Sequence, residues 1–86
     1  MIKEDIENYL KKFSLLKVSD LTFNEKYCVD SFMIKVKQSE YDINYYHLYV
    51  DHKDFRTLYN VKSVIPFGNS LIVKDLHGRR IQISPY

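Results

Sequence analysis

The chain has 86 residues, which is enough for one small domain and too few for two. Hydrophobic residues make up 45% and charged residues 28%, and the net charge of +2 excludes both an acidic nucleic-acid mimic and a polybasic tail. Cys28 is the only cysteine, which excludes an internal disulfide and favours a reducing, cytoplasmic location. No apolar run is long enough for a membrane span or a signal-peptide core.

The first element that the sequence predicts is an amphipathic helix over residues 2–13. Its apolar residues recur at helical spacing and form one stripe. They are Ile2, Ile6, Tyr9, Leu10 and Phe13. Acidic residues lie in the first turn and lysines in the last turn, as the helix dipole favours. A helix of about twelve residues is marginally stable alone, so we expect its stripe to pack on a sheet.

Residues 14–31 follow neither the helical period nor the period of a strand. Their apolar residues fall at uneven steps, and these are Leu15, Leu16, Val18, Leu21 and Phe23. We therefore predict a loop with one short strand in this part of the chain.

From residue 32 onward apolar and polar residues alternate, which is typical of strands with one wet face. In the first of these strands Phe32, Ile34 and Val36 are expected to face inward. The predicted strands lie near residues 32–37, 44–52, 61–65, 71–74 and 79–84. Pro66 is expected to end the third strand, and Asp54 to begin a single helical turn before it.

Two glycine-containing segments predict the turns between the later strands. Residues 67–70 carry turn chemistry, and His77-Gly78 supplies the left-handed position of a tight hairpin. The whole pattern predicts one α+β domain over residues 1–86. In it the N-terminal helix packs on an antiparallel meander of about five strands, as two layers.

Residue patterns that carry chemistry are sparse in this chain. Cys28 has no nucleophile elbow or Gly-rich loop around it, so we expect no catalytic residue. His47 and His52 are five residues apart on one predicted strand and therefore point to opposite faces. Because Cys-x-x-Cys and His-x-x-x-His motifs are also missing, we expect neither a metal site nor a cofactor.

A metal-dependent nuclease is one alternative. Asp51-His52-Lys53 is an acid-x-Lys string at the end of a predicted strand, with Asp30 or Asp42 as an upstream acid. Nucleases of the PD-(D/E)xK type use such residues to hold Mg²⁺ and activate water. No proline precedes either aspartate, and the chain is short for that fold. We therefore predict that the protein is not an enzyme.

The first candidate surface combines aromatic rings and lysines. Tyr45, His47 and Tyr49 lie on the outer face of one predicted strand, and Lys35 and Lys37 on the outer face of its expected neighbour. Tyrosine offers much contact area for little lost side-chain freedom, which suits a protein partner. Rings beside lysines also suit stacking of unpaired bases. The structural alternative is that a given tyrosine packs under the helix or a loop.

The second candidate surface is the basic hairpin predicted at residues 74–80. Lys74, His77, Arg79 and Arg80 lie on or beside its turn. Arginine makes bidentate contacts with phosphates and carboxylates. The alternative is a solvated edge hairpin whose charges deter pairing with other sheets.

These features predict a small non-enzymatic interaction protein, a regulator or inhibitor that binds a larger protein partner. Residues with AT-rich codons (Lys, Ile, Tyr, Asn and Phe) are abundant, which suggests an AT-rich genome, such as that of a low-GC bacterium or one of its mobile elements. The most specific form of the hypothesis is a phage-type inhibitor of a host nucleic-acid enzyme. The alternative function is a nucleic-acid-binding module for single strands or RNA. We expect no membrane contact, and unpaired sheet edges make a homodimer through edge-strand pairing a further expectation.

Overall fold

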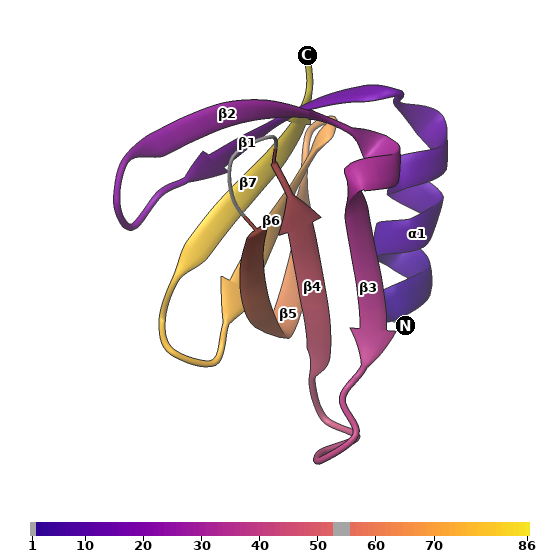
Figure 1. Cartoon of the computed structure of the whole chain (residues 1–86), viewed down its shortest axis with the longest axis vertical. Helices are drawn as coiled ribbons and strands as arrows, with labels where there is room; N and C mark the ends of the chain where they lie inside the picture. Colours follow the sequence, from indigo (N-terminus) through magenta and orange to yellow (C-terminus); the bar gives the residue numbers. More distant parts are fainter. Residues whose placement is uncertain (1, 53–55) are drawn as a thin grey trace.

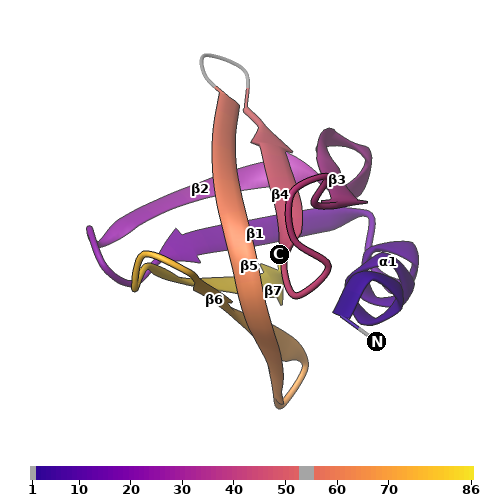
Figure 2. The same cartoon turned by 90° about the horizontal axis from the view of Figure 1, so that it is seen from below.

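The computed structural model describes residues 2–52 and 56–86. In this part of the chain, one helix accompanies seven strands that form a single, strongly curled antiparallel sheet (Figures 1 and 2). The helix is α1 (Ile2–Lys12). The strands are β1 (Leu15–Asp20), β2 (Glu25–Asp30), β3 (Ile34–Gln38), β4 (Tyr46–Asp51), β5 (Arg56–Phe67), β6 (Ser70–Asp75) and β7 (Arg80–Pro85). Their order in the sheet is β2-β1-β7-β6-β5-β4-β3.

The α+β prediction is confirmed in its main lines. The five predicted strands correspond to β3 through β7, and each is the antiparallel neighbour of the next, as in a meander. The helix ends one residue earlier than predicted, at Lys12, and packs mainly on β3 and β5. The number of strands was wrong, because the structure adds β1 and β2 next to β7.

The missed hairpin explains the uneven pattern of residues 14–31. Leu16 and Val18 face inward on β1, but the next inward position holds a charged residue, Asp20. Its carboxylate accepts hydrogen bonds from the backbone N–H groups of Thr22 (2.9 Å) and Phe23 (3.2 Å). This buried carboxylate shapes the turn into β2, and it interrupts the apolar alternation by which a strand is recognised.

Three further predictions need correction. Phe32 does not begin a strand, because it lies in a short 3₁₀ turn (Ser31–Met33) and is 71% exposed. The helical turn expected to reach Tyr59 is replaced by the start of β5 at Arg56, while Asp54 itself lies outside the described residues. Pro66 does not end the strand but lies within β5. At this point β5 pairs only with β6, so a proline without an N–H costs no hydrogen bond to β4.

The core lies inside the curl of the sheet. Among its fully buried side chains are Ile6, Leu16, Leu48, Val61 and Ile83, so helix and sheet contribute together. The single hydroxyl proton of Tyr9 is shared between the carbonyl oxygens of Asn69 (2.7 Å) and Ile83 (3.0 Å), which fastens α1 to the β5–β6 turn and to β7. No helix of the described residues has the length and apolar character needed to cross a membrane.

Candidate functional site

The structure brings the residues of the first candidate surface together. Strands β3 and β4 pair antiparallel, with Lys35 opposite Tyr49 and Lys37 opposite His47. The intervening residues of both strands are buried, so these side chains lie on the outer face of the sheet. The lysines are exposed, and the aromatic residues are half-buried.

Three rings contact one another in a row, which we call the aromatic ladder (Tyr45, His47 and Tyr49). Tyr45 and His47 meet edge to face, with ring centroids 5.7 Å apart at 68°. His47 and Tyr49 stack at 28° with centroids 6.3 Å apart. The guanidinium of Arg56 lies over Tyr49, with Cζ 6.0 Å from the ring centroid. Each ring therefore has a neighbour within the ladder, and Tyr49 is also next to Arg56.

The charges beside the aromatic ladder are mainly positive. Asp51 forms an ion pair with Arg56, in which Nη2 lies 3.2 Å from Oδ2 and Nε contacts Oδ1. Hydrogen bonding to Arg56 lowers the pKa of the Asp51 carboxyl. Lys35 and Lys37 lie on the next strand and add two positive charges, while Glu40 in the β3–β4 loop adds one negative charge beside the ladder.

Several residues around the aromatic ladder were not among the predicted site residues. Leu58 lies opposite Tyr49 on β5 and is partly exposed. Tyr41 and Ile43, in the β3–β4 loop, are both more than four-fifths exposed. A shallow depression of about 200 Å³ lies beside the ladder. It is lined by Lys37, Gln38, Glu40, Tyr41, His47 and Tyr49. The sequence signal for the loop residues is a pair of apolar side chains inside a polar turn.

The second candidate surface, the basic hairpin, keeps its predicted turn. Gly78 has φ +86°, and its N–H donates to the carbonyl oxygen of Asp75 (3.1 Å), as in a short hairpin loop with a left-handed glycine. Lys74 and Arg80 are opposite each other on β6 and β7. Arg80 and His77 are exposed, and Lys74 is half-buried.

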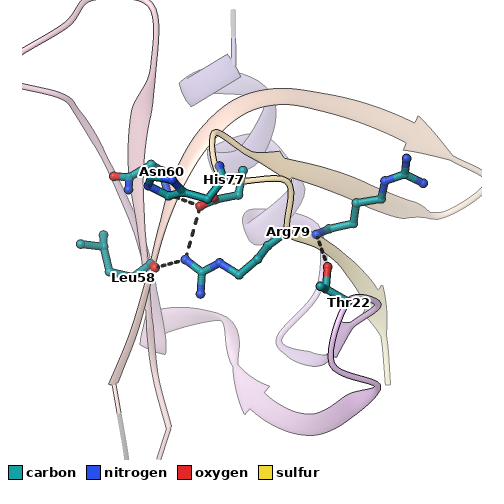
Figure 3. Close-up of polar contacts among 7 residues, drawn as sticks. Thr22, Leu58, Asn60, His77 and Arg79 are labelled. Carbon is teal, nitrogen blue, oxygen red and sulfur yellow. Dashed lines mark hydrogen bonds and ion pairs between the residues drawn. The ribbon is translucent and has the colours of Figure 1, made fainter.

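Arg79 differs from its neighbours because its side chain is folded onto the protein (Figure 3). Its Nη2 donates to the carbonyl oxygen of Leu58 (2.9 Å) and lies 3.4 Å from Oδ2 of Asp75. Its Cζ is 4.6 Å from the centroid of the Tyr59 ring, and 27% of the side chain is exposed. The structure therefore gives Arg79 contacts within the chain, while its predicted contact with a partner stays a prediction.

The carboxylate of Asp75 organises the base of the basic hairpin. It is buried and accepts hydrogen bonds from the backbone N–H groups of Asn60 (2.7 Å) and His77 (2.6 Å). The register of the β5–β6 pairing shifts between Val61 and Ser63, next to the position where Val61 lies opposite Asp75. The side chain thus satisfies backbone donors where the regular ladder is interrupted.

The two candidate surfaces do not form one flat platform. Strand β5 separates β4 and β3 from β6 and β7, and the curl of the sheet turns the two ends in different directions (Figure 2). A partner would therefore contact the aromatic ladder without necessarily reaching His77 and Arg80.

No metal centre is visible within residues 2–52 and 56–86, where no three His, Cys, Asp or Glu side chains gather closely enough to hold an ion. Lys53, which the nuclease alternative requires, lies outside the described residues, and Asp51 is paired with Arg56. Cys28 is exposed on β2.

Comparison of the chain with protein-family models, with curated proteins and with solved structures finds no match. Function therefore has to be inferred from the surface chemistry described above.

Proposed function

We propose that the protein is a non-enzymatic binding module that docks on an acidic region of a larger protein. The observation that supports this most directly is the aromatic ladder, which begins at Tyr45 just before β4 and continues on the outer face of that strand. Its rings are already packed on one another in the free protein, so binding would cost little further side-chain freedom. Tyrosines held in this way are typical of residues that dominate the affinity of protein interfaces.

The orientation of the rings favours a protein partner over unpaired bases. A base needs an open ring face on which to stack. His47 contacts both Tyr45 and Tyr49, and the guanidinium of Arg56 lies over the ring of Tyr49. These contacts leave less ring face for a base, while the tyrosine hydroxyls suit backbone and carboxylate groups of a protein.

Charge supports an acidic partner surface. Lys35 and Lys37 are exposed next to the aromatic ladder, and Arg56 already compensates Asp51. Complementary charges mainly raise the association rate and the specificity of a complex. The exposed Tyr41 and Ile43 extend the same side with apolar area. We expect the association rate to fall as the salt concentration rises.

The regulator or inhibitor role is the specific form of this proposal. A cationic face would be repelled from the phosphate-binding groove of a nucleic-acid enzyme, because that groove is itself positive. A phage-type inhibitor with this surface would therefore bind such an enzyme outside its groove. It would then inhibit the enzyme either by changing the conformation of the enzyme or by blocking the approach of the nucleic acid from one side.

The test compares Tyr49→Ala with Tyr86→Ala in binding to a purified partner that wild type captures from a lysate. Tyr86 directly follows β7, is 76% exposed and serves as the matched control. We expect Tyr49→Ala to weaken binding by about 1 kcal/mol or more, roughly fivefold, with a melting temperature lowered by a few degrees at most. Tyr86→Ala should bind like wild type.

Two results would count against the proposal. Equal binding by Tyr49→Ala and wild type would remove the aromatic ladder from the interface. Micromolar binding of labelled single-stranded oligonucleotides, with a steep salt dependence that Tyr49→Ala abolishes, would instead support the nucleic-acid alternative.

A further inference from the structure

Strand β2 has a free edge in the described sheet, because it pairs only with β1. The register identifies the backbone groups on that edge. The N–H of Ser31 donates to the carbonyl oxygen of Ser14, which marks one hydrogen-bonded pair of the β1–β2 ladder. Such pairs alternate along antiparallel strands, so the odd-numbered residues of β2 bond to β1. The even-numbered residues, Lys26, Cys28 and Asp30, present their N–H and C=O groups to the free edge.

The side chains of these three residues are exposed, with opposite charges at the two ends and Cys28 between them. A lysine on an edge strand normally deters pairing with another strand. It loses that effect when the incoming strand places a carboxylate opposite the lysine. A second copy of β2, running antiparallel, carries Asp30 at the required spacing.

We propose that two copies of the chain pair through β2, with Cys28 opposite Cys28 and Lys26 opposite Asp30 of the second copy. Even-numbered residues have to face even-numbered residues for the strands to exchange hydrogen bonds. The registers that satisfy this rule and overlap most of β2 are centred on Tyr27, Cys28 or Val29. The first places Lys26 opposite Cys28, and the third places Asp30 opposite Cys28. Only the register centred on Cys28 forms charge pairs, and it forms two.

The opposite face of the strand belongs to the interior of each copy. There Tyr27 is half-buried and Val29 is buried, so the choice of register depends on the charges of the exposed face. The interface is separate from the aromatic ladder on β4, so it goes beyond the proposed function and can fail independently of it.

The first experiment blocks the edge without disturbing the fold. In Cys28→Pro the lost N–H faces the free edge, so the β1–β2 ladder keeps all its hydrogen bonds. Cys28→Ser retains the N–H and is the matched control. By light scattering across a concentration series, wild type and Cys28→Ser should form dimers. Cys28→Pro should remain a monomer with the circular dichroism spectrum of wild type.

The second experiment exchanges the charges. Lys26→Glu and Asp30→Lys each place like charges opposite each other in the dimer, and we expect each to weaken dimerisation roughly tenfold. The double variant Lys26→Glu/Asp30→Lys restores opposite charges and should recover the wild-type dimerisation constant within about twofold. Failure of the double variant to recover, while both single variants are weakened and folded, would overturn the register.

Chemical cross-linking gives a third measurement. Residues opposite each other in a hydrogen-bonded antiparallel pair have Cβ atoms about 5.5 Å apart, which is too far for an unstrained disulfide and within reach of a short bis-maleimide. A bis-maleimide should therefore join two copies through Cys28, faster in the native protein than in urea. A wild-type chain that scatters light as a monomer up to millimolar concentration would refute the pairing. So would dimers of Cys28→Pro as stable as those of wild type.

Discussion

The guanidinium of Arg79 lies against the ring of Tyr59, with Cζ 4.6 Å from the ring centroid, and this contact joins the β6–β7 turn to β5. The same group donates to the carbonyl oxygen of Leu58 at 2.9 Å. A partly buried cation over an aromatic face is more favourable than an exposed one. Arg79 thus stabilises the basic hairpin on the sheet, whatever else the hairpin contacts.

Replacement of Arg79 by alanine should therefore lower the free energy of unfolding by about 1–2 kcal/mol. Arg80→Ala is the matched control, since Arg80 is exposed and its contact with Thr22 is made by the backbone N–H (3.0 Å). Urea denaturation monitored by circular dichroism measures both variants. Equal stabilities of the two variants would show that the Tyr59 and Leu58 contacts contribute little.

Loss of the Asp75 carboxylate should be more damaging. In Asp75→Ala the N–H groups of Asn60 and His77 lose a buried charged acceptor, and we expect a loss of about 3 kcal/mol. Asp51→Ala removes a carboxylate whose partner Arg56 has an exposed side chain, and it should destabilise the protein clearly less than Asp75→Ala does. A urea midpoint for Asp75→Ala close to that of Asp51→Ala would contradict this account of the turn.

Alkaline pH should unfold the protein through its buried tyrosines. Burial, followed by the neighbouring Tyr27, raises the pKa of Tyr59 above its ordinary value of 10.0. The folded chain therefore holds a proton that the unfolded chain releases above about pH 10. Stability is fully present below that pH and falls as the pH rises further.

Urea denaturation between about pH 8 and about pH 11 measures this effect. Tyr59→Phe removes the ionisable group, so its stability should decline less over the alkaline part of the range than that of wild type. Tyr86→Phe, at an exposed position, should decline in parallel with wild type. Parallel curves for wild type and Tyr59→Phe would show that another group governs alkaline unfolding.

The two faces of β4 should respond differently to the same substitution. Tyr46 is buried in the core, and Tyr46→Ala should cost about 3–5 kcal/mol. Tyr49 is half-buried on the outer face, and Tyr49→Ala should cost less than about 1 kcal/mol. Thermal unfolding measures both. A large loss in Tyr49→Ala would mean that its ring supports the fold rather than a contact surface.

The β3–β4 part of the candidate site was predictable because its pattern is simple. Each strand alternates apolar and polar residues, so periodicity alone places the side chains of Lys35 and Tyr49 on the outer face. The pairing of the two strands follows from the short polar segment between them. Their register, with Lys37 opposite His47, is set by the loop and by the buried residues on the other face.

Other parts of the structure depend on contacts that periodicity does not encode. Asp20 is a buried carboxylate that serves a turn, so the strand that contains it does not look apolar. Phe32 continues the alternation of β3 in the sequence, yet the 3₁₀ turn carries its side chain out to solvent. The contact of Arg79 with Tyr59 joins residues from different strands, and local sequence gives no sign of it.

The place of β7 between β1 and β6 has a consequence for how fast the chain folds. The β1–β2 hairpin joins the sheet only through β7, and a two-stranded hairpin is marginal in water by itself. Lys17 and Ser84, which pair across this junction, lie at nearly opposite ends of the chain, so their encounter closes a very long loop. We expect this closure to limit the rate, with kinetics closer to those of all-β barrels than of helical domains.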